Sequence, residues 1–172
     1  WKYLLTHGGE NFDVVLYTDD FASQTSLIIS EAMIRKFYLP RYQRIFGEIK
    51  NICPHIKIMF HSCGAVSGII PVLIEMGIDI LNPIQLSCDN MDLAALKKNY
   101  GKDLVFWGGG IDTQRVLPFG TEQEVEDAVK RSIDTLAPGG GFVFNTVHAI
   151  QPEVPPRNIV RMMEAVSKYG GY

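Results

Sequence analysis

The sequence has little of what marks several classes of protein. It holds only three cysteines among 172 residues, and their wide spacing argues against a disulfide framework. We therefore expect a reducing, cytoplasmic setting. The net charge of -3 gives no basic footprint, so nucleic acid is not an expected partner. No apolar run reaches the roughly 18 residues that span a bilayer, so no membrane partner is expected.

What is present is the composition of a globular domain. Hydrophobic residues make up 47% of the chain, which is enough for one sizeable core. We expect a single domain over 1–172. The chain begins at Trp1 rather than at a methionine, and its first residues resemble the end of an element. These features suggest a piece of a longer protein.

Short apolar runs alternate with segments of helical periodicity. The predicted strands are 12–18, 56–60, 79–82, 104–107 and 142–145, and the predicted helices are 30–51, 66–76, 91–100, 121–136 and 156–169. Repeated βα units need a parallel sheet, either doubly wound or closed into a (β/α)₈ barrel. A full barrel takes about 250 residues, so these units would form its later part. No G-x-G-x-x-G turn follows the first strand, which argues against dinucleotide binding.

Local signals mark helix ends and one interruption. Pro40 predicts a kink or a break within the helix at 30–51, because proline lacks the backbone N–H that a helix interior requires. The predicted N-caps are Ser30, either Asp89 or Asn90, and Thr121, which forms a capping box with Glu124.

Polar residues follow each predicted strand. The carboxyl ends of parallel strands form the active-site face of α/β barrels, so these residues are candidates for function. The candidate catalytic residues are Asp19 and Asp20, and the candidate substrate-binding residues are Asn82, Gln85, Gly109, Asp112, Gln114 and Asn145.

The roles of these residues have simpler alternatives. Asp19 and Asp20 could hold a substrate cation, orient a ligand histidine, transfer a proton, or cap the next turn. Adjacent strand residues face opposite ways, so only one of the two aspartates is expected to point into the site. Asp112 could bind substrate or cap a short turn. Gly109 could let substrate approach the backbone or adopt a turn with positive φ.

His61, Cys63 and His148 form the candidate metal set. Imidazole nitrogen and thiolate sulfur are preferred zinc ligands, and a catalytic zinc site uses three protein ligands with one open position. The alternative is that Cys63 is a small packed residue and His148 a hydrogen-bonded loop residue. Cys53 is expected to be structural, and Cys88 is a weaker candidate for a ligand or a redox-sensitive thiol.

Four stretches resemble the uroporphyrinogen decarboxylase superfamily, in particular the branch related to corrinoid-dependent methyltransferases. They read F-H-S-C-G-A-V, D-I-L-N-P-I-Q, F-W-G-G-G-I-D-T-Q-R-V-L-P-F-G-T and G-G-G-F-V-F-N-T-V-H-A-I-Q-P-E-V-P-P-R-N-I. The resemblance implies a (β/α)₈ barrel of TIM type, of which this chain supplies about five βα units from the C-terminal part.

The resemblance also implies a zinc site and a reaction. In the methylcobamide:thiol methyltransferases, an H-x-C pair and a later cysteine hold zinc. His61 and Cys63 match the pair, and His148 stands at the place of the later cysteine. The implied function is methyl transfer between a corrinoid and a thiol or other small acceptor, with a corrinoid protein as a partner.

The sequence is also compatible with two other functions. One is a metal-independent decarboxylase of uroporphyrinogen type that acts on a tetrapyrrole, and the other is a non-catalytic corrinoid-binding protein. A partial barrel would also expose unpaired strand edges, which could pair with a second copy of the chain to give a homo-oligomer.

Overall fold

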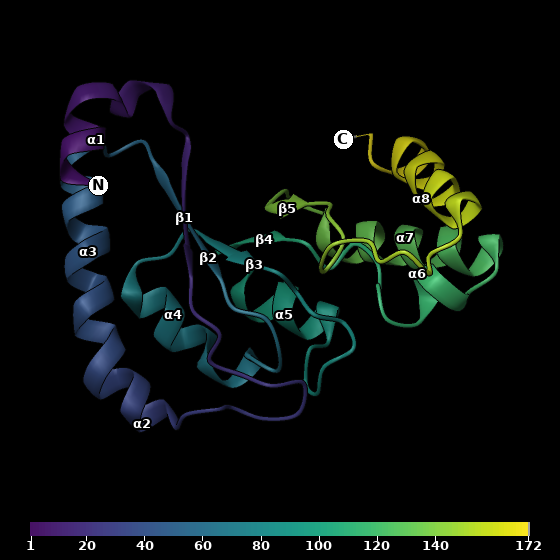
Figure 1. The fold of residues 1–172 in the computed structure, drawn as a ribbon, viewed down its shortest axis with the longest axis horizontal. Coiled ribbons are helices and arrows are strands. Elements are labelled where there is room, and N and C mark those ends of the chain that lie inside the picture. Colours follow the sequence, from purple (N-terminus) through teal and green to yellow (C-terminus); the bar gives the residue numbers. More distant parts are fainter. Residues whose placement is uncertain (172) are drawn as a thin grey trace. The chain divides into compact units, whose positions relative to one another are not determined.

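The structure is a computed structural model that describes residues 1–171, in which five strands alternate with helices (Figure 1). The chain divides into two compact units, Trp1–Asn82 and Pro83–Tyr172. Strands pair in parallel within each unit, as predicted. The expectation of a single domain over the whole chain stays a prediction.

The first unit is built on three parallel strands with β2 in the middle. They are β1 (Val14–Thr18), β2 (Lys57–His61) and β3 (Ile80–Asn82). Helices α1 (Lys2–Gly8), α3 (Leu39–Ile52) and α4 (Ile70–Met76) accompany them, with short 3₁₀ turns η1 (Gly9–Asn11) and η3 (Ser67–Ile69). Helix α1 was not predicted. The core is aromatic, since Phe46 of α3 meets Tyr17 of β1 and Phe60 of β2 edge-on.

The segment predicted as one interrupted helix contains a π-helical turn. It runs from α2 (Glu31–Met33) through the π turn η2 (Ile34–Tyr38) into α3. Ser30 caps it as predicted, accepting a hydrogen bond from the Met33 N–H. Pro40 lies in the first turn of α3, which follows the π turn directly. A wider turn at this point accommodates a residue that cannot donate to the helix, so the interruption is local.

The second unit holds the other two strands and four helices. They are α5 (Leu93–Tyr100), β4 (Val105–Trp107), α6 (Val116–Phe119), α7 (Glu122–Leu136), β5 (Phe142–Val143) and α8 (Pro156–Tyr169). Helix α7 packs against α8. The buried Asn158 amide of α8 donates to the carbonyls of Leu117 and Gly120, which fixes the end of α6.

One predicted helix cap is wrong and one is confirmed. Helix α5 is capped by Asp92, whose carboxylate accepts a hydrogen bond from the Ala95 N–H, and not by Asp89 or Asn90. Asn90 instead adopts a left-handed conformation with φ 59°, which places it in the preceding turn. The capping box at the start of α7 is confirmed.

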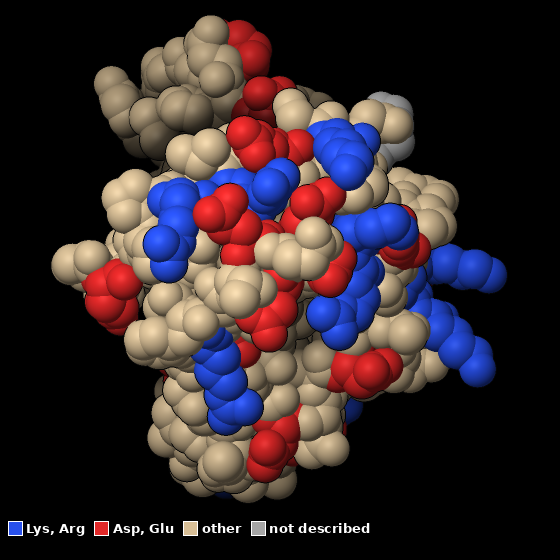
Figure 2. Space-filling model, turned by 90° about the vertical axis from the view of Figure 1, so that its right-hand side faces the viewer, with Lys and Arg blue, Asp and Glu red and all other residues tan. Residues whose placement is uncertain are grey.

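The surface exposes both basic and acidic side chains (Figure 2). Among residues 1–171, no helix combines the length and apolar character needed to cross a bilayer. On the face in Figure 2, basic and acidic side chains are interspersed.

The capping box predicts a local effect on stability. Thr121→Ala removes the hydroxyl that accepts from the backbone at the start of α7 and should lower the free energy of unfolding by about 1 kcal/mol. Urea denaturation followed by circular dichroism measures this change. Thr135→Ala, near the other end of the same helix, is the matched control and should change stability little. Equal losses in both variants would contradict a specific role for the cap.

Candidate metal-binding site

The loop after β1 is fastened to the end of β2. The Asp19 N–H donates to the His61 carbonyl at 3.0 Å, and the Phe21 N–H donates to the Ser62 hydroxyl at 3.2 Å. Ser62 is fully buried. These bonds extend the parallel pairing of β1 and β2 beyond the strands. As a result, polar residues from two distant stretches of sequence lie side by side.

Gly64 allows the two stretches to approach closely. Its φ is +94°, in the left-handed region, and a Cβ placed there would lie 2.5 Å from the Ser23 carbonyl oxygen and 2.7 Å from that of Ala22. Any side chain would therefore push the loop away from β2 and strain the backbone. This explains why glycine follows directly after Cys63.

Asp20, His61 and Cys63 come together at this junction. A ligand atom from each lies within 4.8 Å of the others. The Cys63 N–H donates to Asp20 Oδ1 at 3.0 Å, and His61 Nε2 lies 4.0 Å from the same oxygen. The imidazole is largely covered, with 25% of its side chain exposed, whereas the Asp20 side chain is 52% exposed. The group is therefore open to solvent on the carboxylate side.

The His61 ring is held by the neighbouring strand. Asn82 is its register partner on β3, and Asn82 Oδ1 lies 2.7 Å from His61 Nδ1. The Asn82 carbonyl also accepts a hydrogen bond from the Ser62 N–H at 2.8 Å. Asn82 was predicted to bind substrate, and that role stays a prediction. Its contact with His61 follows from the pairing register of β2 and β3, which could not be predicted from the sequence.

The two adjacent aspartates face different partners. Asp20 faces His61 and Cys63, while Asp19 Oδ2 accepts a hydrogen bond of 2.6 Å from the Tyr42 hydroxyl on α3. Burial, together with the Asp19 carboxylate, raises the pKa of Tyr42 above its usual range. Sequence reasoning missed Tyr42 because an aromatic residue in an amphipathic helix gives no signal beyond core packing.

The donor set fits zinc. Imidazole nitrogen, thiolate sulfur and carboxylate oxygen are all established zinc ligands, and three protein ligands leave one position open in a catalytic site. The Cys63 thiolate and the Asp20 carboxylate would together balance the charge of a divalent cation. Asp20, predicted as a catalytic residue, thus also becomes a candidate ligand.

The remaining candidates lie in the second unit. The side chains of Asn145 and His148 are exposed, and Gln85 is buried. Gly109 has φ +78°, and a Cβ there would lie 2.8 Å from the Cβ of Ile84. The candidate metal group of Asp20, His61 and Cys63 lies within the first unit. The assignment of His148 as a ligand, and of the others as substrate contacts, therefore stays a prediction.

Asp112 has the capping contacts considered as the alternative to substrate binding. Its Oδ1 accepts hydrogen bonds from the N–H groups of Gln114 at 2.7 Å and of Arg115 at 3.0 Å. These bonds stabilise the turn before α6. The Gln114 side chain is exposed.

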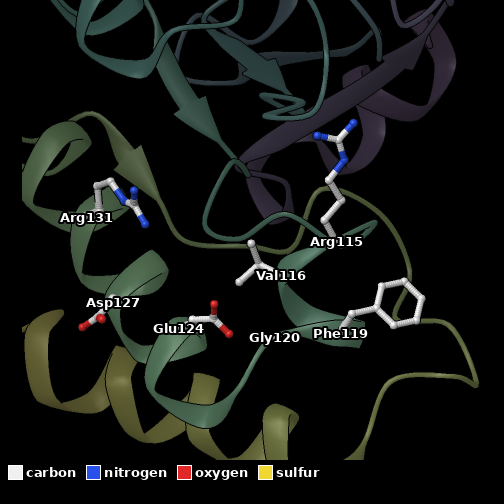
Figure 3. Close-up of a pocket in the computed structure, with 7 residues that line it drawn as sticks. All are labelled: Arg115, Val116, Phe119, Gly120, Glu124, Asp127 and Arg131. Carbon is white, nitrogen blue, oxygen red and sulfur yellow. The ribbon is translucent and has the colours of Figure 1, made fainter.

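The second unit also contains a cavity of about 390 Å³ beside α6 and α7 (Figure 3). Its lining residues are Arg115, Val116, Phe119, Gly120, Glu124, Asp127 and Arg131. The Glu124 carboxylate is engaged by the backbone and hydroxyl of Thr121, which lower its pKa. None of the residues predicted from the sequence to act in the site lines this cavity.

Comparison with known proteins identifies the fold and the family. A solved methyltransferase from Methanosarcina mazei matches with a TM-score of 0.69 at 19% identity, covering 92% of this chain and 43% of that protein. The fold is thus α/β with parallel strands, corresponding to part of a (β/α) barrel.

Sequence comparisons identify the family of the chain. A sequence model described as uroporphyrinogen decarboxylase (URO-D) matches residues 8–169. The uroporphyrinogen decarboxylase of Nostoc punctiforme is 26% identical over 170 residues, and that of Rickettsia felis 25% identical over 167. Each alignment covers 97% of this chain, but 43% and 44% of the relative, so the chain spans less than half their length. The chain belongs to the uroporphyrinogen decarboxylase family.

The Tyr42–Asp19 contact predicts a dependence of stability on alkaline pH. Because the pKa of Tyr42 is raised in the folded state, the unfolded phenol loses its proton first, at about pH 10. The contribution of Tyr42 is therefore complete below this pH and declines above it. When the pH rises from 8 to about 11, the native protein should therefore lose more unfolding free energy than Tyr42→Phe does.

Urea denaturation at the two pH values measures this shift. Tyr3→Phe is the matched control, because Tyr3 is 79% exposed and should show no such shift. A difference for Tyr42→Phe that stays constant with pH would contradict the prediction.

Proposed function

We propose that this protein acts in zinc-dependent methyl transfer between a corrinoid and a thiol or another small acceptor. The observation that carries the proposal is the convergence of Asp20, His61 and Cys63 within 4.8 Å at the ends of parallel strands. That is the face on which barrel enzymes place their chemistry. Because the chain spans less than half the length of its relatives, the activity is proposed for the whole protein.

The residues of the site have distinct roles in this proposal. His61 and Cys63 would hold the metal, and the backbone of Cys63 positions the Asp20 carboxylate beside them. A bound zinc ion would lower the pKa of a thiol acceptor in its open position. The exposed side of Asp20 leaves room for an acceptor to approach from solvent.

Asp20 and His148 are alternative third ligands. Asp20 is supported by its distance from the pair, and His148 by its place in the family pattern. With Asp20, the protein donors carry two negative charges, whereas with His148 they carry one. The second arrangement would leave more positive charge in the site and hold an incoming thiolate more tightly.

The corrinoid part of the proposal rests on similarity to known methyltransferases. The H-x-C pair resembles that of methylcobamide:thiol methyltransferases, and the Methanosarcina mazei protein with the same fold is a methyltransferase. The partner in this proposal is a corrinoid protein. Cytoplasmic location and a homo-oligomer formed through open strand edges are further expectations.

Decarboxylation of a tetrapyrrole is the second candidate function. The specific observation in its favour is that the curated relatives from Nostoc and Rickettsia are uroporphyrinogen decarboxylases. The soft Cys63 ligand next to His61 argues against it, because a metal-independent decarboxylase has no evident need for such a pair.

Zinc analysis is the first test of the proposed function. The purified protein should contain one zinc per chain, and Cys63→Ala should lose it because the soft donor is removed. Cys53→Ala is the matched control, since Cys53 is buried and its thiol donates to the Leu5 carbonyl. Elemental analysis gives the stoichiometry, and a metal-free native protein would contradict the proposal.

Zinc affinity, measured by competition with a chromogenic chelator, distinguishes the third ligand. If Asp20 is the ligand, Asp20→Ala should bind zinc more weakly while His148→Ala binds as the native protein does. The reverse result would assign His148.

Activity separates the candidate functions. Incubation with methylcobalamin and a panel of thiols should change the visible spectrum of the cobalamin as its methyl group is transferred. Loss of a porphyrinogen with no cobalamin turnover would instead support the decarboxylase, and binding of cobalamin without turnover would indicate a non-catalytic protein.

A further inference from the structure

We infer that Asn82 is the positioning residue that fixes the tautomer of His61 and thereby presents its Nε2 lone pair to the group formed with Asp20 and Cys63. This inference concerns the same site as the proposed function and rests on it for its chemical purpose. The tautomer itself, however, is a property of the protein without metal.

The geometry assigns the donor and the acceptor. Asn82 Oδ1 lies 2.7 Å from His61 Nδ1, and an amide oxygen can only accept a hydrogen bond. This contact therefore favours the tautomer that carries the proton on Nδ1. In a neutral imidazole the other nitrogen is then an acceptor, which is the form a metal requires.

The other ring nitrogen faces the metal group. His61 Nε2 lies 4.0 Å from Asp20 Oδ1, so the nitrogen that lacks the proton in this tautomer is the one directed at the Asp20 carboxylate. If Nε2 carried the proton instead, the ring would offer a hydrogen to this group and could not bind a cation. The choice of tautomer therefore decides whether the pair can act as ligands.

Asn82 is itself held firmly. It is the register partner of His61 across β2 and β3, and its carbonyl accepts from the Ser62 N–H at 2.8 Å. The amide therefore meets the ring from a fixed strand rather than from a loop. Partners that hold metal-ligating histidines in this way typically affect metal affinity by 10–100-fold.

Three variants test the inference. Asn82→Leu keeps the size of the side chain and removes the acceptor, while Asn82→Asp retains an acceptor for the Nδ1 proton. Ser62→Ala is the control, because it removes a hydrogen bond at the same strand end without touching the ring.

The first readout is long-range proton–nitrogen NMR on metal-free protein, with His61→Ala to assign the signals. The native protein, Asn82→Asp and Ser62→Ala should show the proton on Nδ1, and Asn82→Leu should lose this preference. A proton on Nε2 in the native protein, or an unchanged tautomer in Asn82→Leu, would overturn the inference. If Asn82→Leu does not fold, the native spectrum still decides.

The second readout is zinc affinity, measured by competition with a chromogenic chelator. Asn82→Leu should bind zinc 10–100-fold more weakly than the native protein, and Asn82→Asp should recover most of the loss. Equal zinc affinities of the native protein and Asn82→Leu would contradict a role of the Asn82–His61 contact in zinc binding. Failure of the native protein to bind zinc would contradict the proposed function and leave the NMR result unaffected.

Discussion

Parallel pairing around β2 determines where Asp20, His61 and Cys63 lie. His61 ends β2 and stands in register with Thr18 on one side and Asn82 on the other. The chain leaving β1 therefore passes directly beside the chain leaving β2, and backbone hydrogen bonds join the two. Gly64 then permits a separation that a side chain would prevent. The site follows from backbone geometry before any side-chain interaction is considered.

The two adjacent aspartates after β1 make different contacts. Asp19 turns toward α3, where Tyr42 donates to it from a partly buried position. Asp20 turns the other way and receives the Cys63 N–H. One aspartate thus links the loop to the helix layer, and the next places its carboxylate beside His61 and Cys63. The hydrogen bond from the Cys63 N–H also couples the two candidate ligands, because a movement of Cys63 would move the Asp20 carboxylate with it.

The sequence predicted elements better than their ends or their contacts. Apolar periodicity located all five strands, and the paired Thr121 and Glu124 located the start of α7, because both signals are local. The cap of α5 was misplaced, since Asp89, Asn90 and Asp92 are all competent caps and only backbone conformation separates them. The short helix α6 was missed because four residues give no periodicity. His61 and Cys63 were predicted as metal ligands from their spacing, whereas the contacts of Tyr42 and Asn82 depend on packing and register.

The nature of the third ligand has a physical consequence for the chemistry that the site can support. A carboxylate beside one thiolate compensates a divalent cation fully, so a neutral thiol would gain less acidity on binding than it would beside two imidazoles. A more acidic bound thiol is also a weaker nucleophile, because the charge that favours ionisation also holds the electron pair. With Asp20 as the third ligand, the bound thiol acceptor would be the better nucleophile. With His148 as the third ligand, the acceptor would be bound more tightly. The neutral amide of Asn82 leaves this balance unchanged, since it orients the His61 ring without adding charge.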